Sequence, residues 1–191
     1  MAEQNYTHTK SDTHIRLSAP LQRDSVVDGP GLRTVIWTQG CAHNCPGCHN
    51  PQTHSFSGGS DIPIDTICDQ INKWKQDVTF SGGDPMQQAK QCAKIARFAK
   101  SIGLNVWAYT GYTIETLLPQ YGKNGYIRDF LNNIDRLVDG KFEIQNKSME
   151  CPFRGSTNQR IIDVPATLNR LECGNNDFVV IDPRYVCDQE V

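Results

Sequence analysis

Short apolar strands alternate with amphipathic helices through the middle of this chain. The segment 32–38 is rich in β-branched and aromatic residues and is bounded by glycines, which is typical of a buried strand. Apolar residues at helical spacing predict an amphipathic helix over 65–75. The same criteria predict strand 77–80, helix 86–101, strand 105–109, helices 113–118 and 127–132, and strand 134–139. This alternation implies an α/β fold with a parallel sheet.

The number of these units limits the architecture. With 191 residues and about four or five units, the chain is too short for a closed eight-fold barrel of roughly 250 residues. A partial, open barrel or a doubly wound sheet fits better, in a single domain. We expect residues 1–20 to be an irregular N-terminal arm, residues 21–164 to form the domain and residues 165–191 to be a C-terminal extension. The Ser-, Gly- and Pro-rich segment 51–63 predicts a loop.

Small and polar motifs follow the expected strands at their carboxyl ends. Cys41–Cys48 follows the first strand, Ser81–Asp84 the second, Thr110–Tyr112 the third and Asp139–Lys141 the fourth. In both candidate architectures, ligands bind at the carboxyl ends of the strands. These four segments are therefore expected to meet at one site.

The charge balance and the apolar runs exclude several partner classes. Lys and Arg number 19 and Asp and Glu 21, which gives a net charge of −2 without a block of like charges. This balance argues against nucleic acid or an anionic membrane as the main partner. The longest apolar runs are far shorter than a transmembrane helix of about 20 residues, and Met1–Tyr6 lacks the apolar core of a signal peptide. We therefore expect a cytoplasmic protein in a reducing compartment.

Three of the eight cysteines, Cys41, Cys45 and Cys48, stand together in a C-x3-C-x2-C run. In a reducing compartment such a group indicates metal or iron–sulfur chemistry rather than disulfides. Thiolates bind iron–sulfur clusters or zinc, and a four-iron cluster normally takes four cysteines. Three thiolates leave one iron with an open position for a ligand. The alternative is a zinc site completed by one of three nearby imidazoles: His43, His49 and His54.

Five ordered motifs resemble those of the radical S-adenosylmethionine (radical SAM) activating enzymes. The longest runs from Asp28 to Asn50 and contains an Asp-Gly-Pro-Gly turn, the first strand and the three cysteines. The others are Ser81-Gly-Gly-Asp-Pro85, Tyr109-Thr-Gly-Tyr112, Val138-Asp-Gly-Lys-Phe142 and Phe153-Arg-Gly-Ser-Thr-Asn-Gln-Arg160. Together they span residues 24–164 and are most similar to the activators of anaerobic (class III) ribonucleoside-triphosphate reductase. The resemblance implies a partial open (β/α) barrel of the radical SAM type.

The resemblance implies a particular chemistry. Cys41, Cys45 and Cys48 would hold a 4Fe-4S cluster whose fourth iron binds the amino and carboxylate groups of S-adenosyl-L-methionine. The reduced cluster passes one electron to the sulfonium, and the 5′-deoxyadenosyl radical so formed takes a hydrogen atom from a glycine Cα of the partner. The implied partner is the large subunit of anaerobic ribonucleoside-triphosphate reductase, and the implied electron donor is a protein such as flavodoxin. The chain itself would contribute ligation, orientation and exclusion of side reactions.

The resemblance also assigns glycines and a histidine to the S-adenosylmethionine cofactor. Gly47 and His49 flank the ligand Cys48 and would lie against the adenine and ribose. Gly47 stands where many members of the superfamily carry an aromatic residue, although the reductase activators also have a small one. Gly82 and Gly83 suit a close approach of the backbone to the methionyl end, because glycine has no side chain.

Three charged residues have two interpretations each. Asp84 either accepts the ammonium group of the cofactor or is a carboxylate at a helix N-terminus. Asp139 and Lys141, at the end of the fourth strand, either contact the ribose and carboxylate of the cofactor or form a solvated ion pair.

Other residues are also open to more than one interpretation. Arg33 is either a surface charge or a contact to the cofactor or partner. The composition of Arg154–Arg160 indicates a solvated loop, whereas the resemblance implies a role at the site mouth or the reductase interface. Trp107 and Tyr109 are expected to pack in the core and at the rim. The dispersed cysteines are interpreted as buried small apolar residues: Cys68, Cys92, Cys151, Cys173 and Cys187.

Three alternative functions stand beside the reductase activase. The first is an activase of another glycyl radical enzyme such as pyruvate formate-lyase, against which the Arg154–Arg160 motif favours the reductase. The second is a small-molecule enzyme of the same superfamily, for which this short chain leaves little material to build a substrate pocket. The third, from a different class, is a non-enzymatic zinc-binding module formed by the three clustered cysteines and an imidazole.

Overall fold

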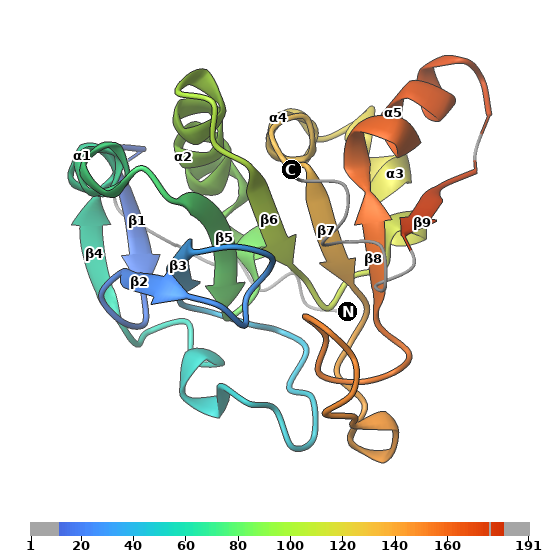
Figure 1. Ribbon diagram of the computed structural model, residues 1–191, viewed down its shortest axis with the longest axis horizontal. Coiled ribbons are helices and arrows are strands. Elements are labelled where there is room, and N and C mark those ends of the chain that lie inside the picture. Colours follow the sequence, from blue (N-terminus) through green and yellow to red (C-terminus); the bar gives the residue numbers. More distant parts are fainter. Residues whose placement is uncertain (1–11, 176, 182–191) are drawn as a thin grey trace.

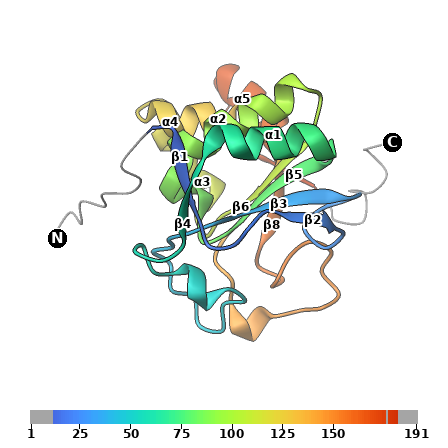
Figure 2. The ribbon, with the colours of Figure 1, turned by 90° about the vertical axis from the view of Figure 1, so that its left-hand side faces the viewer.

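The computed structural model describes residues 12–175 and 177–181 of the 191-residue chain. Within this part, nine strands form one open sheet and five α-helices pack against it, so the fold is mixed α/β (Figure 1). Figure 2 shows the helices along one side of the sheet and the long loops gathered on the opposite side. None of the described helices combines the length and the apolar character needed to cross a bilayer.

The sheet is parallel in its middle and antiparallel on both sides. Its strands are β1 (His14–Leu17), β2 (Gln22–Ser25), β3 (Arg33–Thr38), β4 (Ser60–Pro63), β5 (Asp77–Gly82), β6 (Val106–Tyr109), β7 (Arg136–Asp139), β8 (Arg160–Asp163) and β9 (Val179–Ile181). They lie in the order β4-β1-β3-β5-β6-β7-β8-β9, with β2 paired to β3. β3, β5, β6 and β7 are mutually parallel, and the other pairings are antiparallel. The parallel strands therefore bring four carboxyl ends to one edge.

The helices follow from apolar spacing and capping. They are α1 (Ile64–Trp74), α2 (Ala89–Ser101), α3 (Ile114–Tyr121), α4 (Gly125–Leu131) and α5 (Val164–Glu172), with 3-10 turns η1 (Pro51–Thr53), η2 (Pro85–Gln88) and η3 (Ile144–Asn146). α1 buries Ile67 and Ile71 on one face, as their spacing predicts. Pro85 begins η2, where Asp84 caps the turn by accepting a hydrogen bond from the Met86 N–H. The helix predicted over 86–101 thus starts as a 3-10 turn and becomes α-helical at residue 89.

Alternation along the strands divides the apolar core into two clusters. On β6, Val106 and Ala108 pack in the large cluster between the sheet and the helices. Trp107, on the opposite face, is fully buried in a smaller cluster against which Tyr109 packs. The smaller cluster consists of Trp107, Val138, Ile161 and Ile181, with Tyr109 and Phe153 packed against it. The expectation that Trp107 packs in the core is confirmed.

Four predicted strands are confirmed, whereas β1, β2, β4, β8 and β9 were not predicted as strands. β3, β5, β6 and β7 lie where the sequence predicts strands. The expected irregular arm 1–20 is wrong over β1, and the expected loop 51–63 is wrong over β4; residues 1–11 lie outside the described part. These two strands pair with each other from His14↔Pro63 to Leu17↔Ser60. Such long-range pairing stabilises short strands whose local composition does not predict them.

The dispersed cysteines do not all fit one description. Cys92 is completely buried, as expected. Cys68 and Cys151 are partly exposed, and Cys173 is exposed, so the interpretation as buried apolar residues is wrong for Cys173. Cys187 lies outside the described residues.

Candidate active site

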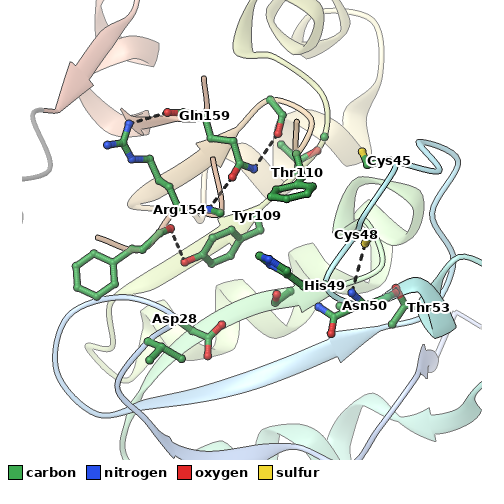
Figure 3. A pocket seen from close by; sticks show the side chains of 18 of the residues that line it. Asp28, Cys45, Cys48, His49, Asn50, Thr53, Tyr109, Thr110, Arg154 and Gln159 are labelled. Carbon is green, nitrogen blue, oxygen red and sulfur yellow. Dashed lines mark hydrogen bonds between the residues drawn. The ribbon is translucent and has the colours of Figure 1, made fainter. Parts of the chain in front are cut away.

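A cavity of about 640 Å³ opens at the carboxyl edge of the four parallel strands (Figure 3). Its lining includes residues at or after the end of each of these strands: Cys41, Cys45, Cys48 and His49 after β3, Gly82 at the end of β5 and Gly83 after it, Tyr109 at the end of β6 and Thr110 and Gly111 after it, and Gly140 and Phe142 after β7. Its volume lies within the range of ligand pockets, about 300–1,000 Å³. The four segments that the sequence places at strand ends thus meet at one site.

Backbone hydrogen bonds hold the cysteine loop in place. The Cys41 N–H donates to the His54 carbonyl at 3.2 Å, which ties the start of the loop to the segment after it. The Cys48 N–H donates to the Cys45 carbonyl at 3.1 Å and closes a tight turn between these two residues. As a result, all three clustered cysteines line the same cavity.

The environment of Cys41 and Cys45 favours the protonated form of these two thiols. Burial raises the pKa of the Cys41 thiol to about 11, and the negative charges of Asp84 and the neighbouring thiols act in the same direction. Burial also raises the pKa of Cys45, while the positive charge of Lys141 opposes this shift. Metal binding at these two thiols therefore releases their protons, so the affinity for a metal centre rises with pH.

The donor set at this cavity fits an iron–sulfur cluster. Its three thiols are the ligands that iron–sulfur clusters take, and the Asn50 N–H donates to the Cys48 sulfur at 3.4 Å, the kind of hydrogen bond that tunes cluster potentials. Within residues 12–175 and 177–181, no group of three or more His, Cys, Asp or Glu side chains converges on the position of one metal ion. Zinc requires such convergence, with ligands about 2.0–2.3 Å from a single atom, whereas a cluster distributes thiolates over separate irons.

Two of the imidazoles considered for zinc, His43 and His54, differ in whether Nε2 has a partner. His43 Nε2 lies 2.7 Å from Asp84 Oδ2, and its ring packs edge-on against Tyr112 with centroids 4.6 Å apart. His54 Nε2 is buried and has no hydrogen-bond partner among the described residues. The contact with Asp84 therefore occupies His43 Nε2, which would otherwise be available as a metal ligand.

Gly82 and Gly83 bring the end of β5 against the backbone that leads into the cysteine loop. Gly82 has a φ of +94°, and a Cβ there would lie 2.6 Å from the Thr38 carbonyl oxygen. A Cβ on Gly83 would collide with the Gly40 carbonyl. Only glycine permits this positive φ and this close approach together. The outcome is a stretch of bare backbone in the cavity wall beside the cysteines.

Asp84 is 1% exposed and joins three loops from behind the cavity wall. Its carboxylate accepts hydrogen bonds from the Met86 N–H at 2.9 Å, the Thr110 hydroxyl at 3.0 Å and the Gly111 N–H at 3.1 Å, besides its pairing with His43. Asp84 is absent from the described cavity lining. The bond to Met86 matches the interpretation as a helix N-terminal carboxylate, and a direct contact to the cofactor stays a prediction.

Asp139 is fully buried and pairs with Arg160 rather than with Lys141. Arg160 Nε and Nη2 donate to the two Asp139 oxygens at 2.9 and 2.6 Å, and the Ile114 N–H donates to Oδ2 at 2.7 Å. Arg160 also donates to both Glu115 oxygens, at 2.8 and 2.7 Å. The interpretation as a solvated Asp139–Lys141 ion pair is therefore wrong, and Lys141 is exposed outside the cavity lining. Contacts of Asp139 and Lys141 with the cofactor stay predictions.

The residues on either side of Cys48 have different surroundings. Gly47 has a φ of +72°, and the Ile144 side chain fills the space beside it, 2.7 Å from where a Cβ would lie. His49 lines the cavity, with its ring centroid 4.9 Å from that of Phe142. Contacts of Gly47 and His49 with the adenine and ribose stay predictions.

Arg33, interpreted above as a possible surface charge, is completely buried. Its Nε donates to the Thr79 hydroxyl at 2.6 Å, and its Nη2 donates to the Val78 carbonyl at 2.9 Å. The Thr79 hydroxyl in turn donates to the Asp28 carbonyl at 2.8 Å. The surface interpretation is wrong because the Asp-Gly-Pro-Gly turn folds over the start of β3. The guanidinium thereby anchors this turn, whose Asp28 lines the cavity, against β5.

Aromatic residues and part of the Arg154–Arg160 run complete the wall. The Tyr109 hydroxyl donates to the Phe153 carbonyl at 2.9 Å, and burial raises the Tyr109 pKa. Arg154 Nη1 donates to the Gln159 carbonyl at 2.8 Å, while Arg154 Nε is buried without an acceptor among the described residues. Arg154 and Gln159 line the cavity, so this segment is more than a solvated loop.

Several lining residues were not identified from the sequence. Val26 and Val27 precede the Asp-Gly-Pro-Gly turn, and an apolar pair in that place was the available signal. Met149 and Cys151 lie in a polar segment between η3 and β8, where nothing in the local pattern distinguishes them. Their place in the wall is set by the course of the loop.

Comparisons with known proteins identify the family. The family described as "4Fe-4S single cluster domain" matches residues 27–162. The anaerobic ribonucleoside-triphosphate reductase-activating protein of Escherichia coli (strain K12) is 33% identical over 144 residues, which cover 70% of this chain and 90% of that protein. Proteins of the same name from Vibrio cholerae and Enterobacteria phage T4 are 34% and 30% identical, over 71% of this chain and 90% and 86% of theirs. This chain belongs to the 4Fe-4S single-cluster family that includes the activating proteins of anaerobic ribonucleoside-triphosphate reductase.

Proposed function

We propose that this chain is a radical S-adenosylmethionine activase that generates a glycyl radical on anaerobic ribonucleoside-triphosphate reductase. The observation that carries the proposal is the meeting of three cysteine thiols with the Gly82–Gly83 backbone in one cavity. Relatives named as activating proteins of this reductase, and the match to a 4Fe-4S family, support it. They also favour the cluster over the zinc-binding module.

Cys41, Cys45 and Cys48 are the proposed ligands of a 4Fe-4S cluster, and three thiolates leave one iron available to the cofactor. When bound, the cluster and S-adenosyl-L-methionine supply the one-electron chemistry that ends in a glycyl radical on the reductase. The Asn50 N–H, which donates to the Cys48 sulfur, stabilises the thiolate form of that ligand.

The cofactor-binding surface is proposed to consist of backbone and flanking residues around the cluster loop. Gly82 and Gly83 offer bare backbone to the methionyl end, and Gly47, Cys48 and His49 approach the adenine and ribose. Cys48, His49, Gly82 and Gly83 line the cavity, which supports their assignments.

The charged residues proposed for the cofactor lie further from it. Asp84 fixes the Gly83 segment through its bonds to Met86 and Gly111, and Asp139 fixes the end of β7 through Arg160. Lys141 is exposed near Cys45, whose pKa its charge affects, and is proposed to meet the carboxylate of the cofactor. The two buried carboxylates, Asp84 and Asp139, orient the binding surface from behind it.

The proposed function also implies a type of fold, a protein partner, an electron donor and a cellular compartment. The open sheet with helices on one side is proposed to be a partial (β/α) barrel of the radical SAM type, and it extends beyond the expected bounds 21–164 because β1 and β9 belong to the same sheet. The partner is the large subunit of the reductase, and a flavodoxin is the proposed electron donor. The reaction is placed in the reducing cytoplasm, with no role for nucleic acid or membrane.

The experiment uses the full chain, reconstituted anaerobically with iron and sulfide. Incubation with dithionite, S-adenosyl-L-methionine and the reductase is expected to give the doublet of a glycyl radical in electron paramagnetic resonance. Cys45→Ala is expected to abolish both the doublet and methionine release, because it removes one of three ligands. Cys173→Ala, a cysteine exposed outside the cavity, is the matched control and retains both.

Two results would contradict the proposed function. Normal methionine release by Cys45→Ala would show that the cluster does not need this ligand. A doublet on pyruvate formate-lyase, with none on the reductase, would assign the chain to another glycyl radical enzyme.

A further inference from the structure

Exposed large apolar side chains gather at the mouth of the cavity. The described part of the chain has seven such residues: Val26, Val27, Leu32, Tyr126, Ile144, Met149 and Val180. Three of them line the cavity, namely Val26 at 64% exposure, Val27 at 70% and Met149 at 91%. Large apolar residues grouped around a cavity mark an interaction surface rather than random exposure.

These three residues come from two separate segments, each fixed by its own contacts. Val26 and Val27 belong to the turn between β2 and β3, which the chain from Arg33 through Thr79 to the Asp28 carbonyl holds against β5. Figures 1 and 2 show this turn at the same side of the sheet as the loop between β7 and β8. One wall of the mouth is therefore held by a buried guanidinium.

Met149 belongs to the second segment, the loop between β7 and β8. The loop is closed on itself by the Thr157 N–H, which donates to the Asn146 carbonyl at 2.8 Å, and by the Ser148 N–H, which donates to the Gly155 carbonyl at 3.3 Å. Met149 projects from this closed loop, and its flexible thioether adapts to the shape of what it covers. The second wall thus combines a fixed backbone with an adaptable apolar tip.

A polar group at the same mouth lacks its partner. Arg154 lines the cavity, and its buried Nε has no acceptor among the described residues. This nitrogen is closed off from the cavity, and Nη1 of the same guanidinium donates to the Gln159 carbonyl, so Arg154 supports the wall from within. Recognition at the mouth rests on the exposed apolar residues, and apolar side chains on a bound peptide would cover Val26, Val27 and Met149.

We propose that Val26, Val27 and Met149 form an apolar clamp that grips the segment of the reductase large subunit carrying the target glycine. This inference rests on the proposed function, which requires a glycine of another protein to reach this cavity. The bound segment has an extended backbone with apolar side chains flanking the glycine. The clamp holds the backbone at the mouth and keeps water out while the glycine Cα lies inside.

The test measures affinity separately from cofactor chemistry. The double variant Val26→Ser/Val27→Ser and the single variant Met149→Ser are each loaded with cluster, and their binding to the intact reductase is measured by anaerobic titration. We expect an affinity at least about tenfold weaker for each, because central apolar contacts dominate such interfaces. The variants and the unmodified chain are compared at equal cluster loading, so that the titration reports docking of the reductase rather than cofactor chemistry.

Matched variants separate the clamp from general loss of apolar surface. Val180→Ser removes a side chain 49% exposed on β9 and outside the cavity lining, and it is expected to leave the affinity unchanged. Met149→Leu keeps an apolar side chain at this position and is expected to retain most of the affinity that Met149→Ser loses. Unchanged thermal midpoints establish that the exposed substitutions leave the fold intact.

The outcomes distinguish the clamp from the proposed function. If the unmodified chain produces no glycyl radical on the reductase, the proposed function itself is wrong. If the unmodified chain produces the radical while the clamp variants bind the reductase as tightly as it does, only the clamp is wrong. An equal loss of affinity in Val180→Ser would also overturn the clamp.

Discussion

Single buried polar residues connect parts of the site that are distant in sequence. Asp84 links the cysteine loop, through His43, to Thr110 at the end of β6. Arg33 links the Asp28 turn, through Thr79, to β5. Both side chains are satisfied by partners within the protein, and such fixed partners pre-organise a binding surface.

Asp84→Asn is expected to destabilise the protein strongly. The new amide group would face the N–H donors of Met86 and Gly111 with one acceptor fewer. We expect the free energy of unfolding to fall by about 2–4 kcal/mol, as measured by urea denaturation. Asp69→Asn on the exposed side of α1 is the control and is expected to change it by less than about 0.5 kcal/mol. Equal stability of the two variants would contradict the linking role of Asp84.

The sequence predicts the reactive residues better than their supports. The cysteine run and the Gly82–Gly83 pair stand in short motifs, so their residue types and spacing carry the prediction. The burial of Arg33 and the pairing of Asp139 with Arg160 depend on contacts between segments far apart in sequence. Local pattern carries no information about such contacts, which is why a surface charge and a solvated ion pair were expected in their place.

At the level of whole elements, an ion-pair network fastens α3 to the end of the sheet. Arg160 on β8 binds Asp139 on β7 and Glu115 in the first turn of α3. The hydrogen bonds from Arg160 lower the pKa of Glu115 to about 2. A carboxylate whose pKa is lowered in the folded state stabilises that state above its unfolded pKa, and the stabilisation disappears as the pH falls toward 2.

Glu115→Gln is expected to make the free energy of unfolding less dependent on pH below pH 6. Between pH 6 and pH 3 the unmodified protein loses part of the contribution of Glu115, whereas the variant has no carboxylate to protonate there. Because Glu115 is half exposed, the difference is at most about 1 kcal/mol. Urea denaturation at the two pH values measures it, with Glu172→Gln at the exposed end of α5 as control. An identical pH dependence in Glu115→Gln and the unmodified protein would refute this assignment.

Strands are predicted correctly from the sequence where their local composition indicates burial. β6 is apolar over its full length and β3 is rich in β-branched and aromatic residues, so the sequence predicts both. β1 and β4 have four residues each and mix polar with apolar side chains, and they form because each supplies the other with a hydrogen-bonding partner. Pairing of this kind is a tertiary effect, which propensity within a short window does not capture.

At the level of the molecule, four strands deliver distant segments to one cavity, so anything that binds there cross-links them. Residues from the cysteine loop to the end of the β7–β8 loop share its wall. A ligand that binds the folded chain and not the unfolded one stabilises the whole fold. Cofactor binding should therefore be visible as global stability.

S-adenosyl-L-methionine is expected to raise the thermal midpoint of the cluster-loaded protein. At 100 times its dissociation constant a ligand adds about 2.7 kcal/mol, which for a chain of this size corresponds to roughly 5–10 °C. Anaerobic circular dichroism measures the shift, and removal of the cluster by a chelator is expected to abolish it. The same shift in Cys45→Ala would show that the nucleoside binds independently of the cluster.

One face of β6 packs against the helices and the other faces the cavity, and this difference has an evolutionary consequence. Ala108 faces the helices, while its neighbour Tyr109 lines the cavity. Changes at the first position alter how many chains fold, and changes at the second alter what each folded chain achieves. Adjacent codons are therefore under different selective pressures, one on the yield of folded protein and one on the activity of the folded protein.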